Sequence, residues 1–421
     1  MGGLKAWLSV AGVGAVLAGG GLGCRQRAEA VQGEAALRRM VNQRVAAVER
    51  ATGLTFKHEP AVALRARAQM REYVLRKLDE QYTPAELRGV EAAYHLFGLA
   101  PDSLDLRETM VALLTEQVAG YYDPDSATLY VGADLAGMDS LVIRTTVAHE
   151  LVHALQHQYL DLDSIIDVRR QSDRTLAAQA VLEGQATLAQ TLVMMPEQQL
   201  DQLPSFWEAR SVVRKQQTLM PQFARAPLWL RETLIFPYLG GADFVRWYLI
   251  QHPGSQPYGA AMPVSTEQIL HPERYAAGDA PTVLAFTGAP TGVAYEDGLG
   301  ELEIRVLLME LLPDTNEVEA PSIAAGWDGD RYRAYDAGGG AYALVWYSVW
   351  DDAREAEEFA AGLERAWKRR SQGRTGRRSE IRQLEIDGMP GVRLVDAPVG
   401  WGGWRAVPGV RVVPPMLPST R

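Results

Sequence analysis

The sequence predicts an α+β protein, with a mainly helical domain over residues 25–325, whose core is at 100–250, and a smaller α+β domain over 326–421. Apolar residues recur three and four positions apart along much of the first half, which is the period of an amphipathic helix. Two short β-rich runs flank a turn signal within the first domain. Every tryptophan except Trp7 lies at or after Trp207, so the composition changes in the second half.

Residues 1–24 predict an export signal, because Lys5 is their one charge and an apolar, glycine-rich run from Ala6 to Leu22 follows it. The run is short for a membrane span of about 20 residues, and its glycines disfavour a helix, so removal fits better than an uncleaved anchor. The ending Gly21-Leu22-Gly23-Cys24 resembles the lipobox of bacterial lipoproteins, which implies lipidation at Cys24. The alternative is an ordinary secretory signal. In either case we expect export, and with lipid an anchor in the bacterial cell envelope, on the periplasmic or the outer surface.

Composition excludes several kinds of site. Cys24 is the single cysteine, so an intramolecular disulfide, a cysteine-rich zinc site and an iron–sulfur cluster are excluded, and histidines and carboxylates must bind any metal. The 42 Lys and Arg against 52 Asp and Glu give a formal charge of -10. Without a concentrated basic face, nucleic acid is not an expected partner.

The first part of the chain is predicted to contain two or three packed helices and a hairpin. Helical spacing extends from about 29 to 99 and is clearest over Ala63–Leu78 and Pro84–Leu96. The segment from Val118 to Val131 contains two β-rich runs around an Asp-Pro-Asp-Ser turn signal, which predicts a β-hairpin.

Two long helices are predicted after the hairpin. One extends from about Ser140 to Tyr159, with Asp139 as its N-cap. The second extends from about Arg174 to Met195, capped by Asp173.

The end of the chain predicts the smaller α+β domain. A loop rich in Gly and Asp is expected from Gly326 to Gly340, followed by a strand at Ala341–Trp350 and a helix at Ala353–Trp367. Two further strands are expected near Ile381–Ile386 and Val392–Val395.

The strongest chemical signal is His149-Glu150-Leu151-Val152-His153, an H-E-x-x-H motif. On a helix, this spacing places two imidazoles one turn apart and directs both at one metal ion. His157 and Glu150 fall on the same side of the helix as both histidines, while apolar residues fill the rest. Histidines without metal, at the surface or in the core, are the alternative.

Glu183 is the best candidate for a third metal ligand, because a catalytic zinc normally has three protein ligands and an open position. It lies among apolar and small residues in the middle of the next predicted helix, and a buried carboxylate needs a partner. Gly184 beside it costs helix stability, which is reasonable where another helix or the metal approaches closely. The alternative is a capping or ion-pairing carboxylate.

His149-Glu150-x-x-His153, followed by Glu183 on the next helix, resembles the gluzincin type of zinc metallopeptidase. The resemblance covers residues 145–190 and implies a zincin-like domain with one Zn²⁺ per chain. It implies that both histidines and Glu183 bind zinc and that Glu150 is the general base. Thermolysin-like enzymes have an Asp four residues after the third ligand, as an outer partner for a histidine ligand.

That position holds Thr187 here, which leaves the outer partner of the histidines open. Asp161 and Asp163, just beyond the helix of the motif, are candidates to replace it.

The wider chain resembles a group of little-characterised predicted bacterial lipoproteins. Four segments carry this resemblance: Gly120-Tyr-Tyr-Asp-Pro124, His149-Glu-Leu-Val-His-Ala-Leu-Gln156, Glu183-Gly184 and Ser265-Thr-Glu-Gln-Ile-Leu-His-Pro272. It spans most of the mature protein and supports a zinc-peptidase-like fold, but it implies no substrate.

The resemblance implies a mechanism in which zinc activates water and Glu150 carries its proton to the leaving amine. A further donor is then needed for the developing oxyanion, and the candidates for oxyanion or substrate contact are His157, Tyr121, Tyr122 and Tyr238. The hairpin before the motif stands where such peptidases keep an edge strand that pairs with substrate backbone.

Three functions remain open. The leading hypothesis is a zinc metallopeptidase that hydrolyses protein or peptide in the cell envelope, held at the membrane through lipid if Cys24 is modified. The second is a non-catalytic lipoprotein that uses a peptidase-like fold as a binding or assembly module, with its tryptophan-rich half as the interaction surface. Core packing explains the tryptophans better, and the intact Glu150 favours catalysis. The third is a zinc hydrolase for a bond other than a peptide.

Overall fold

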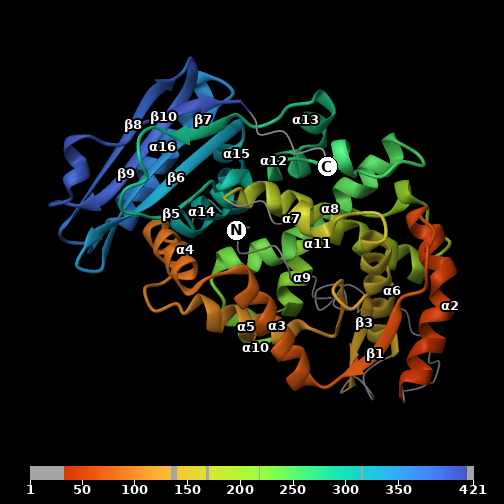
Figure 1. Cartoon of the computed structure of the whole chain (residues 1–421). Coiled ribbons are helices and arrows are strands. Elements are labelled where there is room, and N and C mark those ends of the chain that lie inside the picture. The colour runs from red at the N-terminus through yellow and green to blue at the C-terminus, as the bar shows by residue number, and fades with distance from the viewer. Residues whose placement is uncertain (1–32, 134–139, 167–169, 218, 314–315, 415–421) are drawn as a thin grey trace.

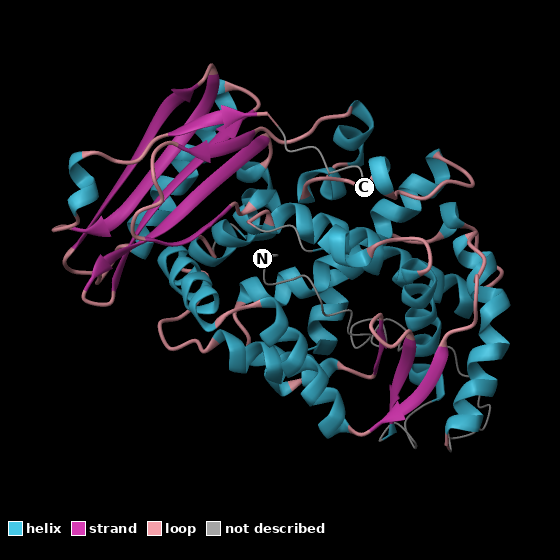
Figure 2. Cartoon of the chain, in the orientation of Figure 1, coloured by secondary structure: helices cyan, strands magenta, loops and turns pink. Residues whose placement is uncertain are grey.

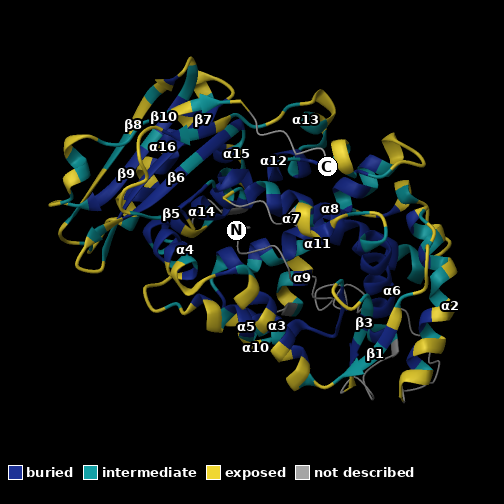
Figure 3. Ribbon diagram, in the orientation of Figure 1, coloured by how far each residue is buried: buried dark blue, intermediate teal, exposed yellow. Residues whose placement is uncertain are grey.

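The chain folds as a mixed α+β protein, as its sequence predicts, with a large helical part and a five-stranded sheet beside it (Figures 1 and 2). The computed structural model describes residues 33–133, 140–166, 170–217, 219–313 and 316–414. Figure 3 shows buried residues in the middle of the helical part and within the sheet.

Two predictions lie outside the described residues. These are the export signal at 1–24, with lipidation at Cys24, and the N-cap role of Asp139. Within the described ranges, no helix combines the length and the apolar character that a membrane span needs.

Three helices form the start of the described chain, α2 (Glu34–Thr52), α3 (Arg67–Gln81) and α4 (Pro84–Phe97). The predicted helix over 84–96 is confirmed: the Thr83 hydroxyl accepts a hydrogen bond from the N–H of Glu86, and Pro84 fits the first helical position.

The predicted helix start at Ala63 is wrong, because Ala61–Arg65 forms strand β1. This strand pairs in parallel with β3 (Thr128–Gly132), with Ala61 opposite Thr128. The partner strand lies more than sixty residues away in sequence, so pairing in the folded chain overrides the local helical pattern.

The predicted hairpin is confirmed. β2 (Gly120–Asp123) pairs antiparallel with β3, and the sheet order β1-β3-β2 leaves β2 at an edge. This edge strand packs on helix α6 (Ser140–His157). Gly120 allows the close approach, since a Cβ there would lie 2.9 Å from Cγ2 of Thr146.

The centre of the helical part is built from α6, α8 (Ser172–Met194) and α11 (Leu228–Gln251). Both predicted long helices are present. Asp173 is not the N-cap of α8, however, because Gln171 holds that position. The carboxylate of Asp173 instead accepts hydrogen bonds from the N–H and hydroxyl of Thr266.

Helices α8 and α11 cross at a pair of glycines. A Cβ on Gly184 would lie 2.1 Å from the carbonyl carbon of Gly241, and a Cβ on Gly241 would lie 1.9 Å from the carbonyl oxygen of Ala180. Nearly every α8 residue from Ser172 to Gln190 is buried, so the helix has no free side toward which it can shift. The crossing therefore fixes the depth of α8 in the core.

The sheet of the second half has the order β5-β6-β7-β9-β8, and every neighbouring pair is antiparallel. Its strands are β5 (Val293–Asp297), β6 (Trp327–Gly338), β7 (Ala341–Trp350), β8 (Arg377–Ile386) and β9 (Met389–Pro398). Helix α16 (Ala353–Arg370) covers one face, where Phe359 stacks on Trp350 with ring centroids 4.3 Å apart. The predicted strands and helix after residue 340 are confirmed.

The predicted loop at 326–340 is wrong, because 327–338 forms strand β6. Its Gly and Asp residues lower strand propensity, but Tyr332 packs in the core and Arg333 pairs with Glu296 on β5. Strand β5 also precedes residue 326, so the sheet begins earlier in the chain than the predicted domain boundary.

Several tryptophans are fully buried, which agrees with the core-packing interpretation. Trp346 lies edge-on to Phe97 of α4, with centroids 5.2 Å apart, and so joins the sheet to the helical part. Trp229 donates a hydrogen bond to the buried Glu303.

The remaining elements connect these parts. They are α5 (Leu106–Gln117), α7 (Leu162–Ile166), η2 (Leu200–Gln202), α9 (Arg210–Gln217), α10 (Pro221–Arg225), η3 (Gly259–Ala261), α12 (Thr266–Leu270), α13 (Pro272–Ala277), β4 (Val283–Phe286), α14 (Gly300–Leu311), α15 (Asn316–Ala324), η4 (Gly402–Arg405) and β10 (Val410–Val413).

Gly184→Ala is expected to lower the free energy of unfolding. Alanine favours a helix over glycine by about 1 kcal/mol. Here the added methyl meets backbone atoms of α11, and such overpacking costs about 1–3 kcal/mol or more, so the clash wins. Denaturant unfolding measures the change. Gly402→Ala, whose Cβ would meet nothing within 4 Å, is the control and should change stability little. A variant at 184 as stable as the unsubstituted protein would contradict the crossing described above.

Candidate metal centre

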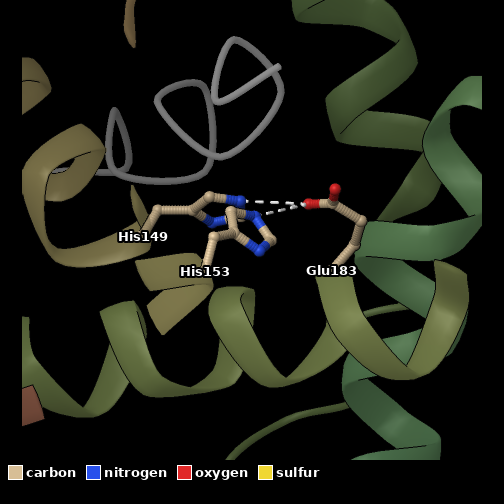
Figure 4. A group of neighbouring side chains, drawn as sticks. All are labelled: His149, His153 and Glu183. Carbon is tan, nitrogen blue, oxygen red and sulfur yellow. Dashed lines mark hydrogen bonds and ion pairs between the residues drawn. The ribbon is translucent and has the colours of Figure 1, made fainter. Parts of the chain in front are cut away.

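Helices α6 and α8 bring three predicted ligands together in the interior. His149 and His153 lie one turn apart on α6, and Glu183 faces them from the middle of α8 (Figure 4). Their residues are 0%, 5% and 6% exposed, so neither the imidazoles nor the carboxylate is solvated as a surface group would be. Among the residues that the structure describes, these three form the group that can hold a metal ion.

The distances within this group suit a small metal ion. Oε2 of Glu183 lies 3.0 Å from Nε2 of His149 and 3.4 Å from Nε2 of His153. Ligands about 2.0–2.1 Å from a tetrahedral zinc lie roughly 3.3 Å from one another. Within the described chain, Nε2 of His153 is buried and makes no hydrogen bond, which fits a nitrogen that is oriented toward a metal.

The electrostatics of the group are those of one carboxylate held between two imidazoles. Burial alone would raise the pKa of Glu183, but the charge of His153 and the hydrogen bond with His149 lower it to about 2. Burial disfavours the charged form of His153, yet the Glu183 and Glu150 carboxylates raise its pKa to about 9. Burial lowers the pKa of His149. Glu183 therefore stays ionised in the core, where its negative charge favours the binding of a cation.

Glu150 is held beside this group but is not part of it. The backbone N–H of Tyr122 on the edge strand β2 donates to Oε2 of Glu150 at 2.7 Å. The other oxygen, Oε1, is buried and has no hydrogen-bond partner within the described residues. Burial raises the pKa of Glu150 to about 8, against the opposing effect of His153. The side chain is thus fixed by one oxygen, while the other is buried without a hydrogen bond in the described part of the chain.

Three of the four candidates for oxyanion or substrate contact lie on the side of α6 or contact His149, and the fourth points away. The hydroxyl of Tyr122 lies 2.9 Å from Nδ1 of His157, on the side of β2 that faces α6. The ring of Tyr238 stacks on His149 with centroids 5.8 Å apart. Tyr121 points to the opposite face of the strand, where its hydroxyl accepts a hydrogen bond from Arg65. The structure therefore places the hydroxyl of Tyr121 beside Arg65, on the side of β2 away from α6.

The predicted outer partners of the histidines were wrong. Asp161 accepts a hydrogen bond from the N–H of Ser164, and neither Asp161 nor Asp163 bonds to a histidine of the centre. Instead, Oε1 of Gln156 lies 2.9 Å from Nδ1 of His153. The sequence did contain a signal, because Gln156 follows His153 by three positions and so lies on the same side of the helix.

The family model that matches this chain does not include the residues of the centre. A family model described as "Domain of unknown function (DUF8575)" matches residues 290–396, which include most of the five-stranded sheet. A crystal structure from Chloroflexus aurantiacus, described as that of a "putative hydrolase with a novel fold", has 16% sequence identity and a TM-score of 0.36. The similarity covers 65% of this chain and 98% of that one. No curated protein matches the sequence.

His149→Ala and Glu183→Ala are each expected to remove most of the bound metal, because two ligands leave an incomplete site. Elemental analysis of the purified protein should find about one metal ion per unsubstituted chain. His252→Ala, at the exposed end of α11, is a matched control that should retain the metal. Full metal content in both ligand variants would contradict this assignment.

Metal binding is expected to release at least one proton at neutral pH, since the raised pKa of His153 keeps its imidazole charged without metal. Affinity should therefore rise with pH and level off above about 9, where that imidazole becomes neutral without metal. Calorimetric titration in two buffers with different ionisation enthalpies counts the protons. An unchanged apparent enthalpy between the buffers would show that no proton leaves.

Proposed function

We propose that the protein is a zinc-dependent metallopeptidase, with His149, His153 and Glu183 as the zinc ligands and Glu150 as the general base. One observation carries this proposal: the buried group of His149, His153 and Glu183 lies beside Oε1 of Glu150, which makes no hydrogen bond to a described residue. Two imidazoles and one carboxylate are a ligand set that catalytic zinc uses, and they leave a fourth position for water.

Zinc, when bound, polarises a carbonyl and lowers the pKa of water to about 7. Glu150 takes the proton of the attacking water on Oε1 and delivers it to the leaving nitrogen, so the carboxylate returns to its starting state. The N–H of Tyr122 on Oε2 keeps the carboxylate in place while Oε1 gains and loses this proton. A neighbouring dication favours the ionised carboxylate, which offsets the effect of burial on its pKa.

Two groups near the centre are candidates to stabilise the oxyanion. The pair of Tyr122 and His157 joins the edge strand to the end of α6, and Tyr238 lies over His149 from α11. We propose that substrate backbone pairs along β2, which is the edge strand of its sheet. This favours a peptide over other hydrolysable substrates.

We place the activity in the bacterial cell envelope, with protein or peptide as substrate and a lipid tether at Cys24. This part of the proposal rests on the export signal and the lipobox-like ending of residues 1–24. Mass spectrometry of the mature N-terminus of protein expressed with its full sequence tests it. A diacylated cysteine would support the tether, whereas an unmodified N-terminus would leave an ordinary exported protein.

Glu150→Gln is expected to retain about one zinc per chain and to lower peptide hydrolysis by about 10²–10⁴-fold, because the amide binds no proton at neutral pH. A peptide library and a panel of ester and amide substrates, read by mass spectrometry, measure the activity. Glu358→Gln, an exposed change on α16, is the matched control.

Three outcomes would count against the proposal. Hydrolysis that survives Glu150→Gln would remove Glu150 as the base. Cleavage of esters alone would favour a non-peptide hydrolase. Zinc binding without hydrolysis of any substrate in the panel would favour the binding module.

A further inference from the structure

A chain of side-chain amides begins at His153 and leads away from the metal centre. Nε2 of Gln156 donates to Oε1 of Gln185 at 2.8 Å, and Nε2 of Gln185 donates to Oε1 of Gln256 at 2.6 Å. Nε2 of Gln256 donates in turn to the carbonyl oxygen of Thr52, at 2.7 Å. This chain of hydrogen-bonded amides connects α6, α8, the segment after α11 and the end of α2.

Backbone carbonyls fix the amide directions of Gln156 and Gln256, and these two fix that of Gln185 between them. Nε2 of Gln156 also donates to the carbonyl oxygen of Leu182 at 2.9 Å. A carbonyl only accepts, so turning the Gln156 amide over would place oxygen against oxygen. The carbonyl of Thr52 fixes Gln256 in the same way, and the hydroxyl of Tyr258 donates to Oε1 of Gln185. Each amide therefore has one satisfied orientation.

This direction determines which nitrogen of His153 keeps its proton when the ring is neutral. With its NH₂ group committed to α8, Gln156 presents only its oxygen to Nδ1 of His153, at 2.9 Å. Nδ1 must then be the donor, and in the neutral ring Nε2 keeps its lone pair. Nε2 is the atom 3.4 Å from Oε2 of Glu183, so the lone pair lies within the ligand group.

We propose that Gln156 is the positioning residue of the metal centre, an inference that rests on the proposed function. It holds His153 in the tautomer and ring orientation that present Nε2 to zinc, and the chain through Gln185 and Gln256 holds Gln156. Gln156 is 0% exposed and Gln185 is 2% exposed, so water does not replace these bonds. Outer partners of this kind typically contribute 10–100-fold to metal affinity.

Two substitutions separate positioning from a purely structural role. Gln156→Leu removes both the acceptor for His153 and the donors for α8. Gln156→Glu keeps the acceptor but loses the donors and adds a buried charge. Positioning therefore predicts that glutamate rescues metal binding, whereas a structural role predicts that glutamate is no better than leucine.

Zinc affinity of the full chain, measured by competition with a chromophoric chelator, is the first readout. Gln156→Leu should weaken zinc binding by about 10–100-fold, and Gln156→Glu should recover most of this loss. Gln158→Leu is the matched control, since Gln158 directly follows α6 and bonds at the surface with Lys57 and His58. Its affinity should match that of the unsubstituted protein.

Nitrogen-15 NMR of the histidines in the zinc-loaded, unsubstituted protein gives a second readout that needs no variant to fold. It should show Nδ1 of His153 protonated and Nε2 bound to metal. The reverse pattern, unchanged affinity in Gln156→Leu, or a Gln156→Glu variant as weak as Gln156→Leu would each overturn the inference alone. Absence of zinc from the unsubstituted protein would overturn the proposed function and this inference together.

Discussion

The Glu183 carboxylate, buried between two imidazoles, is the constraint on which the rest of the site depends. A lone carboxylate in the core would cost several kcal/mol, so α8 can lie this deep only because α6 supplies His149 and His153 opposite it. The requirement is mutual, since the buried imidazole of His153, whose pKa is raised to about 9, also needs a carboxylate. The two imidazoles and the carboxylate are already desolvated before a cation binds, so little reorganisation opposes binding.

Two contacts position α8, one beside Glu183 and one in the first turn of the helix. Gly184, the residue after Glu183, meets Gly241 of α11 backbone to backbone, which fixes the depth of the helix beside the ligand. At its first turn, Asp173 binds the N–H and hydroxyl of Thr266, which prevents the helix from sliding along its axis. Thr266 belongs to the Ser265–Pro272 segment, so this motif contributes to the site by holding α8 rather than by chemistry.

Sequence reasoning succeeded where a local pattern carries the structure and failed where partners are distant. The helical spacing of His149 and His153, the turn before β3 and the isolated carboxylate at 183 each depend on neighbours within one element. Strand β1 depends on a partner far along the chain, and β6 depends on pairing that outweighs its Gly and Asp residues. The outer partners failed differently: Asp161 and Asp163 were selected for charge, whereas the structure uses the neutral amide of Gln156.

The hairpin shows why one register is needed to hold Glu150, the general base that we propose. Among the described residues, only the backbone N–H of Tyr122 bonds to Oε2 of Glu150, and a shift of one residue would turn that N–H away from α6. Two features of Gly120-Tyr-Tyr-Asp-Pro124 prevent the shift. Gly120 lets the strand approach Thr146 at a distance that any side chain would block, and Asp123 closes the turn by accepting from the hydroxyl of Ser126. Gly120, a residue without a side chain, therefore determines where the carboxylate of Glu150 can lie.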